Sequence, residues 1–206
     1  MIRTGIDVSR HQGVIDWNKV KGNADFAIIR AGYGKSIKQK DPRFESNYAG
    51  ATAAGIPVGA YWYSYAKTPA EAKQEALVCK QAIKGKRFEY PVYFDIEDKS
   101  QSGLSKQTLT AICKAFCEEL EKAGYFVGVY ANTDWFRNKL DHPALSKAYT
   151  IWLADYRTNY DKELKCDMHQ YTSKGTVPGI SGRVDMNTCT RNFPTIMRKA
   201  GLNGCK

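Results

Sequence analysis

The alternation of short apolar segments with helical patterns is the feature that most constrains how this chain can fold. Eight segments are short, apolar and rich in β-branched or aromatic residues, and Gly, Pro or Asp residues bound them. These predicted strands are residues 4–8, 25–31, 57–65, 91–97, 126–132, 149–155, 166–172 and 182–187. Strands that alternate with helices favour a parallel sheet, and eight such strands can close into a barrel.

Helix signals are clear in the first two thirds of the chain and weak or absent between the last four predicted strands. The clear signals are an Asp-Pro pair at 41–42 before residues 43–55, a capping box at 68–71 before residues 71–83, and Ser105 before an apolar stripe that ends at Gly124. An open doubly wound sheet is the structural alternative, but it usually keeps full-length helices between its strands. We therefore predict an α/β fold, an irregular TIM-like (β/α) barrel, with residues 1–206 forming a single catalytic domain.

The net charge of the chain limits the kind of partner that it binds. Lys and Arg number 31 and Asp and Glu number 21, which gives a formal net charge of +10 at pH 7. Such a surface favours an anionic partner, and a merely solvated basic surface is the alternative. The basic residues are scattered and no nucleic-acid-binding motif accompanies them, so we expect no nucleic-acid partner. An anionic polymer such as a cell wall fits better.

Signals for export, membrane insertion and structural zinc are missing from the sequence. Residues 1–13 lack an apolar core of signal-peptide length, and no later segment is long enough to span a membrane. We expect no membrane insertion. Three alternatives stay open: a cytosolic protein, release by another route such as host lysis or holin-type export, or a signal that has been removed. None of the six Cys forms a C-x-x-C pair and only three His occur, which argues against structural zinc. The disulfide state stays open, and we expect a monomer.

Carboxylates cluster where the predicted strands end. The segment PVYFDIED carries Asp95, Glu97 and Asp98 directly after an apolar run. Residues i and i+2 of a strand share a face, so Asp95 and Glu97 are expected to point the same way. Asp7 and Asp185 lie at the ends of the first and eighth predicted strands, which become neighbours if the barrel closes. We therefore expect four strand-end carboxylates to share one mouth of the barrel.

Three kinds of chemistry use such a cluster. Mg²⁺ or Ca²⁺ would need mostly oxygen ligands, and a zinc hydrolase would need more His than His11 and His169 supply. A nucleophilic Ser would need an elbow of the G-x-S-x-G kind, which the sequence lacks. Acid–base catalysis needs one carboxyl group with a raised pKa and a second that stays ionised. Crowded negative charge raises one pKa, which favours glycoside hydrolysis, with a metal-dependent hydrolase as the alternative.

Aromatic residues near the same strand ends support a saccharide ligand. The candidates for substrate binding are Tyr61, Tyr63, Tyr130, Trp152 and Tyr156. Sugar rings stack their C–H faces on aromatic rings, so a cleft lined in this way suits a polysaccharide. The alternative for each of these residues is a place in the hydrophobic core.

Four motifs, which together span nearly the whole chain, carry a resemblance to a known family. They are GIDVSRHQGVIDW near the N-terminus, DPRFESNYAGATAAGIPVGAYWYSY in the second unit, PVYFDIE, and GTVPGISGRVDMN near the C-terminus. In this order and spacing they resemble the glycoside hydrolase family 25 lysozymes, the N,O-diacetylmuramidases of phage endolysins, bacterial autolysins and some fungi. The resemblance implies a flattened barrel with five βα units followed by a mostly β remainder.

The resemblance also implies an activity and residue roles. It implies cleavage of the β-1,4 bond between N-acetylmuramic acid and N-acetylglucosamine in cell wall peptidoglycan, outside the cell and without a metal or other cofactor. Glu97 corresponds to the general acid/base, and Asp95 to the residue that positions the substrate acetamido group for neighbouring-group attack. Asp7 and Asp185 correspond to supporting carboxylates on the cleft floor. Substrate assistance, which we favour, and direct inversion both stay open.

Two positions depart from the family pattern. Trp62 stands where many relatives have His, and strand alternation directs it away from Tyr61 and Tyr63, so we expect this change to be structural. His169 stands where many relatives have Trp, and it precedes Gln170, which is a further substrate-binding candidate in the cleft wall. Neither departure involves a carboxylate.

A catalytically silent relative that only binds wall glycan is the second interpretation of the resemblance. The pair Asp95 and Glu97 argues against it, because a binding module has no need for crowded carboxylates. A phage endolysin and a bacterial autolysin use the same chemistry, so the sequence does not choose between these origins.

Overall fold

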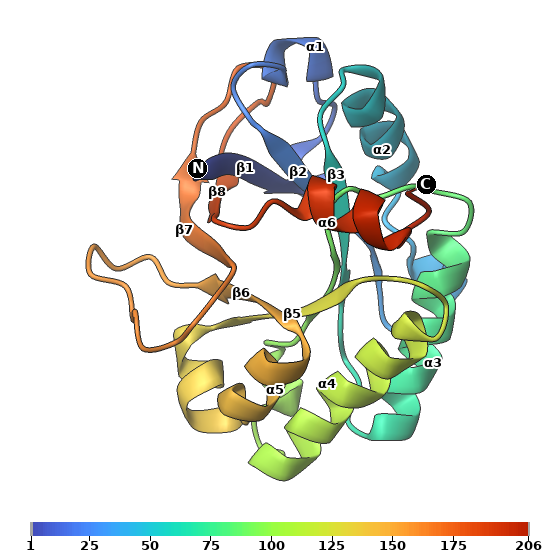
Figure 1. Ribbon diagram of the computed structural model, residues 1–206, viewed down its shortest axis with the longest axis vertical. Coiled ribbons are helices and arrows are strands. Elements are labelled where there is room, and N and C mark those ends of the chain that lie inside the picture. The colour runs from blue at the N-terminus through green and yellow to red at the C-terminus, as the bar shows by residue number, and fades with distance from the viewer. Residues whose placement is uncertain (1, 206) are drawn as a thin grey trace.

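The computed structural model describes residues 2–205, in which eight strands close into one barrel (Figure 1). The strands follow one another around the barrel in sequence order. They are β1 (Arg3–Val8), β2 (Phe26–Tyr33), β3 (Val58–Tyr63), β4 (Val92–Asp95), β5 (Val127–Asn132), β6 (Thr150–Ala154), β7 (Met168–Gly175) and β8 (Val184–Cys189). The predicted α/β barrel of eight strands is confirmed.

Strand direction changes only at β8. Neighbours from β1 to β7 are parallel, whereas β8 is antiparallel to both β7 and β1. Asp185 is therefore the second residue of its strand, and its expected place at a strand's C-terminal end was wrong. Because β8 runs in reverse, its start lies at the same mouth as the end of β1, where Asp185 pairs with Asp7.

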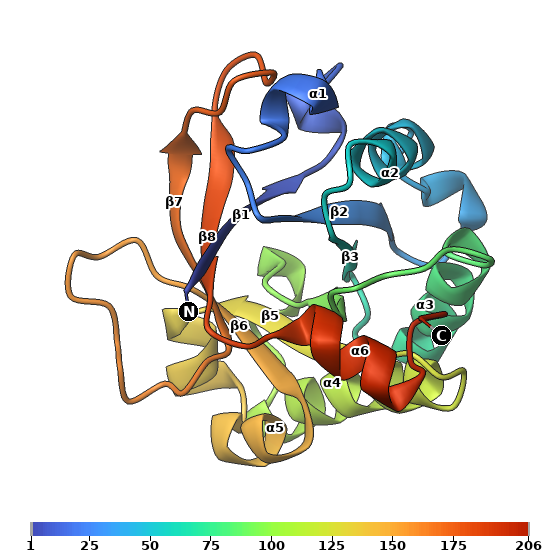
Figure 2. The ribbon, with the colours of Figure 1, turned by 45° about the horizontal axis from the view of Figure 1, so that its top comes forward.

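Five helices each follow one of the first five strands, and Figure 2 shows them around the barrel from α1 at the top, past α2 and α3 on the right, to α4 and α5 at the bottom. They are α1 (Trp17–Val20), α2 (Phe44–Ala53), α3 (Pro69–Ala82), α4 (Lys106–Glu121) and α5 (His142–Ala148), with α6 (Phe193–Ala200) after β8. Single-turn helices η1 (Arg10–Gln12), η2 (Ile37–Gln39), η3 (Lys99–Gln101) and η4 (Trp135–Lys139) lie in the loops. In residues 2–205 no helix separates β6, β7 and β8. The antiparallel pair of β7 and β8 needs no crossover, whereas the parallel crossover from β6 to β7 is a loop, residues 155–167.

Two of the predicted helix starts have the expected caps. The side chain of Thr68 accepts a hydrogen bond from the N–H of Glu71, and that of Ser105 accepts one from the N–H of Thr108. Such caps satisfy N–H groups that have no partner within the helix. The strong local signals at these positions were therefore sufficient to place α3 and α4.

The predicted cap at Asp41 was wrong. Helix α2 begins at Phe44, after Arg43, which makes no side-chain cap. The buried Asp41 carboxylate instead accepts hydrogen bonds from the N–H of Arg43 at 2.9 Å, the N–H of Arg10 at 3.1 Å and Nε of Arg30 at 2.6 Å. An ion pair with a distant strand has thus replaced the local helix cap.

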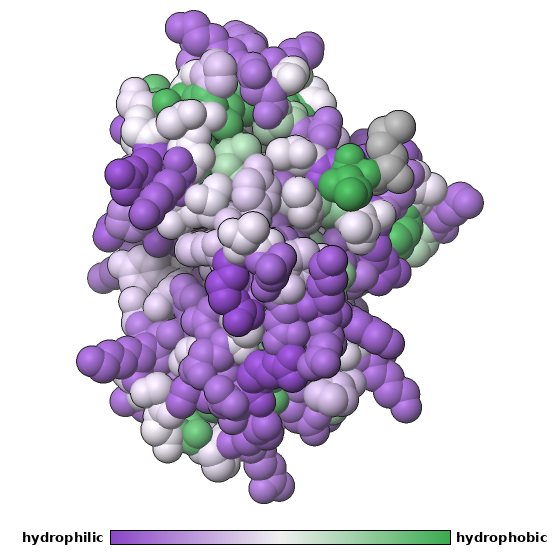
Figure 3. All heavy atoms as spheres, turned by 90° about the vertical axis from the view of Figure 1, so that its left-hand side faces the viewer, coloured by the Kyte–Doolittle hydropathy of each residue, from purple (hydrophilic) through white to green (hydrophobic). Residues whose placement is uncertain are grey.

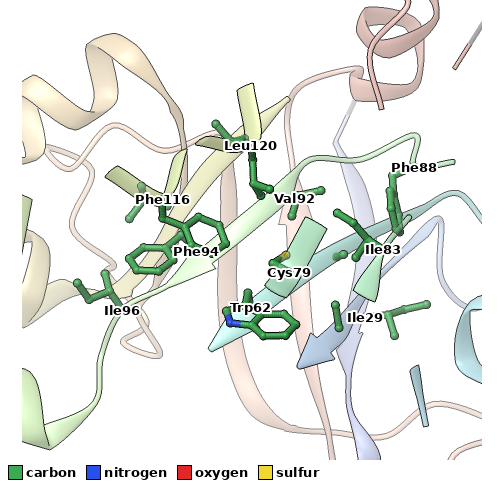
Figure 4. Packing of buried hydrophobic residues seen from close by; sticks show 14 of the residues in the cluster. Ile29, Trp62, Cys79, Ile83, Phe88, Val92, Phe94, Ile96, Phe116 and Leu120 are labelled. Atoms are coloured by element: carbon green, nitrogen blue, oxygen red, sulfur yellow. The ribbon is translucent and has the colours of Figure 1, made fainter. Parts of the chain in front are cut away.

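The hydrophobic core has an outer layer between strands and helices (Figure 4). There the ring of Phe94 from β4 lies 4.4 Å from that of Phe116 from α4, measured between centroids. Trp62 belongs to this layer, is fully buried, and donates from Nε1 to the carbonyl oxygen of Gly34. It points away from the barrel interior, as strand alternation predicted.

An inner layer fills the barrel at the end where the parallel strands begin, here called the closed end. Phe26 and Tyr90 stack there with centroids 4.4 Å apart. Phe193 of α6 packs edge-on against Tyr90 at 5.6 Å, so α6 covers this end. The central hollow of the barrel lies at the opposite, open end.

Three further observations concern the cysteines, the helices and one face of the surface. All six Cys are free thiols, and Cys113 and Cys117 are buried on α4. Among the described helices, none has the length and apolar character needed to cross a bilayer. Figure 3 shows the face beside β7, which is mainly hydrophilic.

Candidate active site

Four carboxylates from three strands and one loop line a single hollow at the open end of the barrel. β1 contributes Asp7, β4 contributes Asp95, the loop after β4 contributes Glu97, and β8 contributes Asp185. This central hollow has a volume of about 250 Å³. The structure thus brings together all four carboxylates that the sequence singled out, although their chemical roles stay predictions.

Asp7 is the most firmly held of the four. It is 5% exposed, and its Oδ2 accepts hydrogen bonds from Gln170 Nε2 and Asn187 Nδ2, each at 2.8 Å. Burial, and then the neighbouring Asp185, raise the pKa of Asp7 to about 7. Sequence reasoning missed Asn187, although it follows Asp185 by two positions on the same strand and so faces the same way.

Asp95 is buried without full hydrogen bonding. Its Oδ1 has no hydrogen-bond partner among residues 2–205. Burial, then Glu97, then Asp7 raise the pKa of Asp95 well above its usual range, and Arg30 opposes this rise. An ionised carboxylate with a buried, unpaired oxygen is costly, so the free protein favours the neutral form of Asp95.

Glu97 lies in the loop after β4 and is half-buried, so it is more exposed to solvent than Asp95. Burial raises its pKa first, followed by the charges of Asp185 and Asp98. Asp98 itself belongs to the loop structure: it accepts hydrogen bonds from the N–H of Ser100 at 2.9 Å and from the Tyr63 hydroxyl at 3.0 Å. These bonds outweigh burial and lower the pKa of Asp98. The third carboxylate of PVYFDIED is therefore a capping residue and lies outside the central hollow.

Arg30 supplies a positive charge that sequence reasoning missed. It lies on β2 and is the only Lys or Arg among the described residues that line the central hollow. Its side chain is 12% exposed and pairs with the fully buried Asp41 side chain. Alternation after Phe26 and Ile28, which face the barrel interior, could have placed Arg30 on the inner face.

The predicted aromatic residues and Gln170 all line the central hollow, but at different depths. Trp152 is 1% exposed and donates from Nε1 to Asn187 Oδ1 at 2.8 Å, so it offers no free ring face to a sugar. We therefore assign Trp152 to the floor of the hollow. The hydroxyls of Tyr130 and Tyr156 both donate to Gln170 Oε1, at 2.9 and 2.7 Å. Of these residues Tyr156 has the largest exposed fraction, 53%.

Two further hollows flank the central one and share residues with it. The Arg157 hollow, of about 380 Å³, shares Glu97, Tyr130 and Tyr156 and adds Asn132, Thr133, Asp134, Ala154, Asp155 and Arg157. The Arg10 hollow, of about 220 Å³, shares Arg30 and Tyr63 and adds Arg10, His11, Tyr33 and Tyr65. The three hollows form one groove with the carboxylates in its middle, which suits an extended polymer.

His169 lies outside the three hollows. It is buried, stacks on Tyr160 at 4.1 Å, and its Nε2 lies 2.7 Å from the carbonyl oxygen of Asp155. It therefore affects the groove only through the loop that carries Asp155 and Tyr156. In the part of the chain that the structure describes, no three His, Cys, Asp or Glu side chains are grouped so that they could hold a metal ion.

Known proteins share this sequence pattern and this barrel. The sequence model of Glycosyl hydrolases family 25 matches residues 6–180. The autolytic lysozyme of Clostridium acetobutylicum is 28% identical over 187 residues, which are 89% of this chain and 54% of that protein. The structure of a bacterial lysozyme from Streptomyces coelicolor matches with a TM-score of 0.83 at 26% identity, over 99% of this chain and 98% of that one.

A structure of the modular autolysin LytC from Streptococcus pneumoniae in complex with a synthetic peptidoglycan ligand is also similar. It has a TM-score of 0.81 and 29% identity, over 92% of this chain and 47% of that one. The chain thus spans about half the length of LytC and of the clostridial lysozyme.

Proposed function

The chain belongs to glycosyl hydrolases family 25, and on that premise we propose that it is a lysozyme. It hydrolyses the β-1,4 bond between N-acetylmuramic acid and N-acetylglucosamine in peptidoglycan. The observation that carries this proposal is the cluster of four carboxyl groups, all with raised pKa values, at the centre of an open groove. Relatives named lysozyme and autolysin support it.

Glu97 acts as the general acid. It lines both the central hollow and the Arg157 hollow, so a glycan that follows the groove passes directly over it. Its raised pKa keeps a larger protonated fraction near neutral pH than an exposed Glu would have. Glu97 gives this proton to the glycosidic oxygen as the bond from that oxygen to C1 breaks.

Asp95 positions the neighbouring group. It accepts a hydrogen bond from the acetamido N–H of the muramyl residue, whose carbonyl oxygen bonds to C1 as the leaving sugar departs. The Glu97 carboxylate then takes a proton from a water molecule, whose oxygen attacks C1 and displaces the acetamido oxygen. The product is a muramyl reducing end with retained configuration. Asp7 and Asp185 line the same hollow, and in their ionised forms they stabilise the positive charge that develops at C1.

The first experiment compares the wild-type protein with Glu97→Gln on purified peptidoglycan in the presence of a chelator. We expect new muramic-acid reducing ends, identified by mass spectrometry, and a loss of at least about 10²-fold in rate in the variant. Glu118→Gln, on the exposed face of α4, is the matched control and should retain full activity. Unfolding temperatures of the three proteins would show that each is folded.

Other outcomes would point to other functions. Glucosamine reducing ends would mean that the groove cuts the alternate bond. Binding to insoluble peptidoglycan without cleavage would favour a silent glycan-binding protein. Activity that appears only after a divalent metal is added would favour a metal-dependent hydrolase.

We place the site of action at the cell wall, outside the cytoplasmic membrane, and the protein acts there as a monomer. The net charge of +10 favours binding to a polyanionic wall, and salt screens such attraction. Cleavage of intact walls should therefore slow as ionic strength rises. A rate that is indifferent to salt would contradict the electrostatic part of this proposal, and sedimentation would test the monomer.

A further inference from the structure

The Arg10 hollow is a part of the groove that the proposed chemistry does not use. The loop after β1 contributes Arg10 and His11, β2 contributes Arg30 and Tyr33, and β3 with the loop after it contributes Tyr63 and Tyr65. Because it shares Arg30 and Tyr63 with the central hollow, a polymer that crosses the carboxylates continues into it.

Of the two arginines in this hollow, Arg30 is paired with Asp41, whereas Arg10 is anchored only through its backbone. The backbone N–H of Arg10 donates to Asp41 Oδ2, the same oxygen that accepts from Arg30 Nε. One buried carboxylate therefore anchors two arginines. The guanidinium of Arg10 is exposed and has no hydrogen-bond or ion-pair partner within residues 2–205. Partial burial, then Arg30 and Arg10, lower the pKa of His11, which adds a neutral hydrogen-bonding group.

Among the described residues that line the opposite end of the groove, no cation is free of an acidic partner. Arg157 donates from Nε and Nη2 to the two carboxylate oxygens of Asp155, at 2.8 and 2.6 Å. Asp134 adds a further acid to the same hollow. Since the central hollow carries four carboxyl groups, an anionic substituent on the substrate is best accommodated in the Arg10 hollow.

Aromatic rings in the Arg10 hollow provide a surface for the sugar itself. Tyr65 lies 6.1 Å from Tyr33 and 5.2 Å from Tyr63 between ring centroids, and it is 45% exposed. An exposed ring beside a free guanidinium fits a pyranose that carries a carboxylate. In peptidoglycan every second ring is a muramyl residue, which bears such a group either on its lactyl ether or on the peptide attached to it.

We propose that the Arg10 hollow is a subsite for the muramyl residue that lies two rings along the strand from the one whose C1 is attacked. There Arg10 binds the substituent carboxylate and so determines substrate specificity. This proposal rests on the proposed lysozyme function. Arg10 lies beyond the carboxylates that carry out hydrolysis, so it selects the substrate through binding and does not take part in bond cleavage.

The test compares Arg10→Gln with the wild-type protein on matched substrates. Glycan strands stripped of peptide carry free lactyl carboxylates, and carbodiimide coupling with methylamine converts these to neutral amides. We expect Arg10→Gln to lower kcat/KM about tenfold on the free-carboxylate strands, mainly through KM, and less than twofold on the neutral strands. Arg10→Lys should recover part of the loss. Arg198→Gln, the same change on the exposed face of α6 at the closed end, should have no effect.

The outcomes separate a failure of the proposed lysozyme function from a failure of carboxylate recognition by Arg10. If the wild-type protein cleaves neither substrate, the lysozyme function fails. If it cleaves both and Arg10→Gln has no effect, or lowers kcat/KM equally on both, carboxylate recognition by Arg10 is overturned.

Discussion

The inward-facing residues of β4 change character within two positions, because Tyr93 belongs to the closed end of the barrel and Asp95 to the open end. Tyr93 is fully buried in the inner apolar layer with Phe26, Tyr90 and Phe193. Asp95 shares the central hollow with three other carboxylates. Residues two apart on one strand are separated by only about 7 Å. A rigid apolar layer therefore directly supports the reactive groups.

The two ends contribute to stability with opposite signs. Apolar area removed from water at the closed end stabilises the fold. At the open end, burial raises carboxyl pKa values, which means that the ionised forms are less stable in the folded protein than in the unfolded chain. If this contrast is right, changes at the closed end should reduce stability and changes at the open end should reduce activity.

The largest expected effect on stability comes from Phe193→Ala at the closed end. Phe193 is fully buried between α6 and the rings of Tyr90 and Phe126. Removing a buried aromatic ring and leaving a cavity lowers the free energy of unfolding by about 3–5 kcal/mol, which urea denaturation would measure. Activity per folded molecule should stay unchanged.

Leu77→Ala on α3, at a site that is 48% exposed, is the matched control and should lower the free energy of unfolding much less. Loss of activity in folded Phe193→Ala would show that the two ends are coupled.

The second prediction concerns Asp7, whose removal should stabilise the protein at alkaline pH. Its pKa is raised from 3.8 to about 7 in the folded state, so folding favours its protonated form. The resulting penalty is absent below about pH 4, grows as the pH rises through this interval, and is complete above about pH 7. Asp7→Asn should therefore raise the free energy of unfolding at pH 8 by on the order of 2–4 kcal/mol and have little effect at pH 3.5.

Urea denaturation of Asp7→Asn and wild type at the two pH values measures this difference. Glu118→Gln serves as the control, because an exposed acid should change stability by less than about 0.5 kcal/mol at either pH. An Asp7→Asn variant that is less stable than wild type at pH 8 would mean that the bonds from Gln170 and Asn187 outweigh the burial of charge.

Features that depend on neighbouring residues could be predicted from the sequence, whereas features that depend on distant strand pairing could not. The strands and the helices α2, α3 and α4 followed from periodicity and from local caps such as Thr68 and Ser105, because these signals depend on neighbouring residues. The helices α1, α5 and α6 were not predicted from the residues. The direction of β8 depends on its pairing with β1 and β7, which no local pattern encodes. Asp185 nevertheless reached the expected mouth, because the reversed strand has its start where a parallel strand would have its end.

Residues whose place depends on distant partners were not predicted. Asp41 has a strong helix-cap signal, but the ion pair with Arg30 holds it elsewhere. Arg30 itself lies in an apolar strand, where alternation indicates a face but not a function. Glu75 is fully buried on α3, accepts a hydrogen bond from the N–H of Tyr65, and has a pKa that burial raises to about 7. A charged residue in a helical pattern normally indicates the solvent-exposed face, so only the packed structure shows this burial.

The smallest expected effect is a shift in the pH dependence of kcat/KM when Asp185, a carboxylate of the open end, is replaced by Asn. Burial is the first cause of the raised pKa of Glu97, and the charge of Asp185 is the second. Asp185→Asn removes that charge, so the pKa of Glu97 falls while the effect of burial remains. If Glu97 must be protonated to cleave the bond, kcat/KM falls as the pH rises. In the variant this fall should occur at a lower pH than in wild type, by less than about one pH unit.

A pH–rate profile on peptide-free glycan strands measures this shift, with Glu118→Gln as the control variant that should not change it. If the decline stays in place or moves to higher pH in Asp185→Asn, another group must control it, and the assignment of Glu97 as the acid would have to be abandoned.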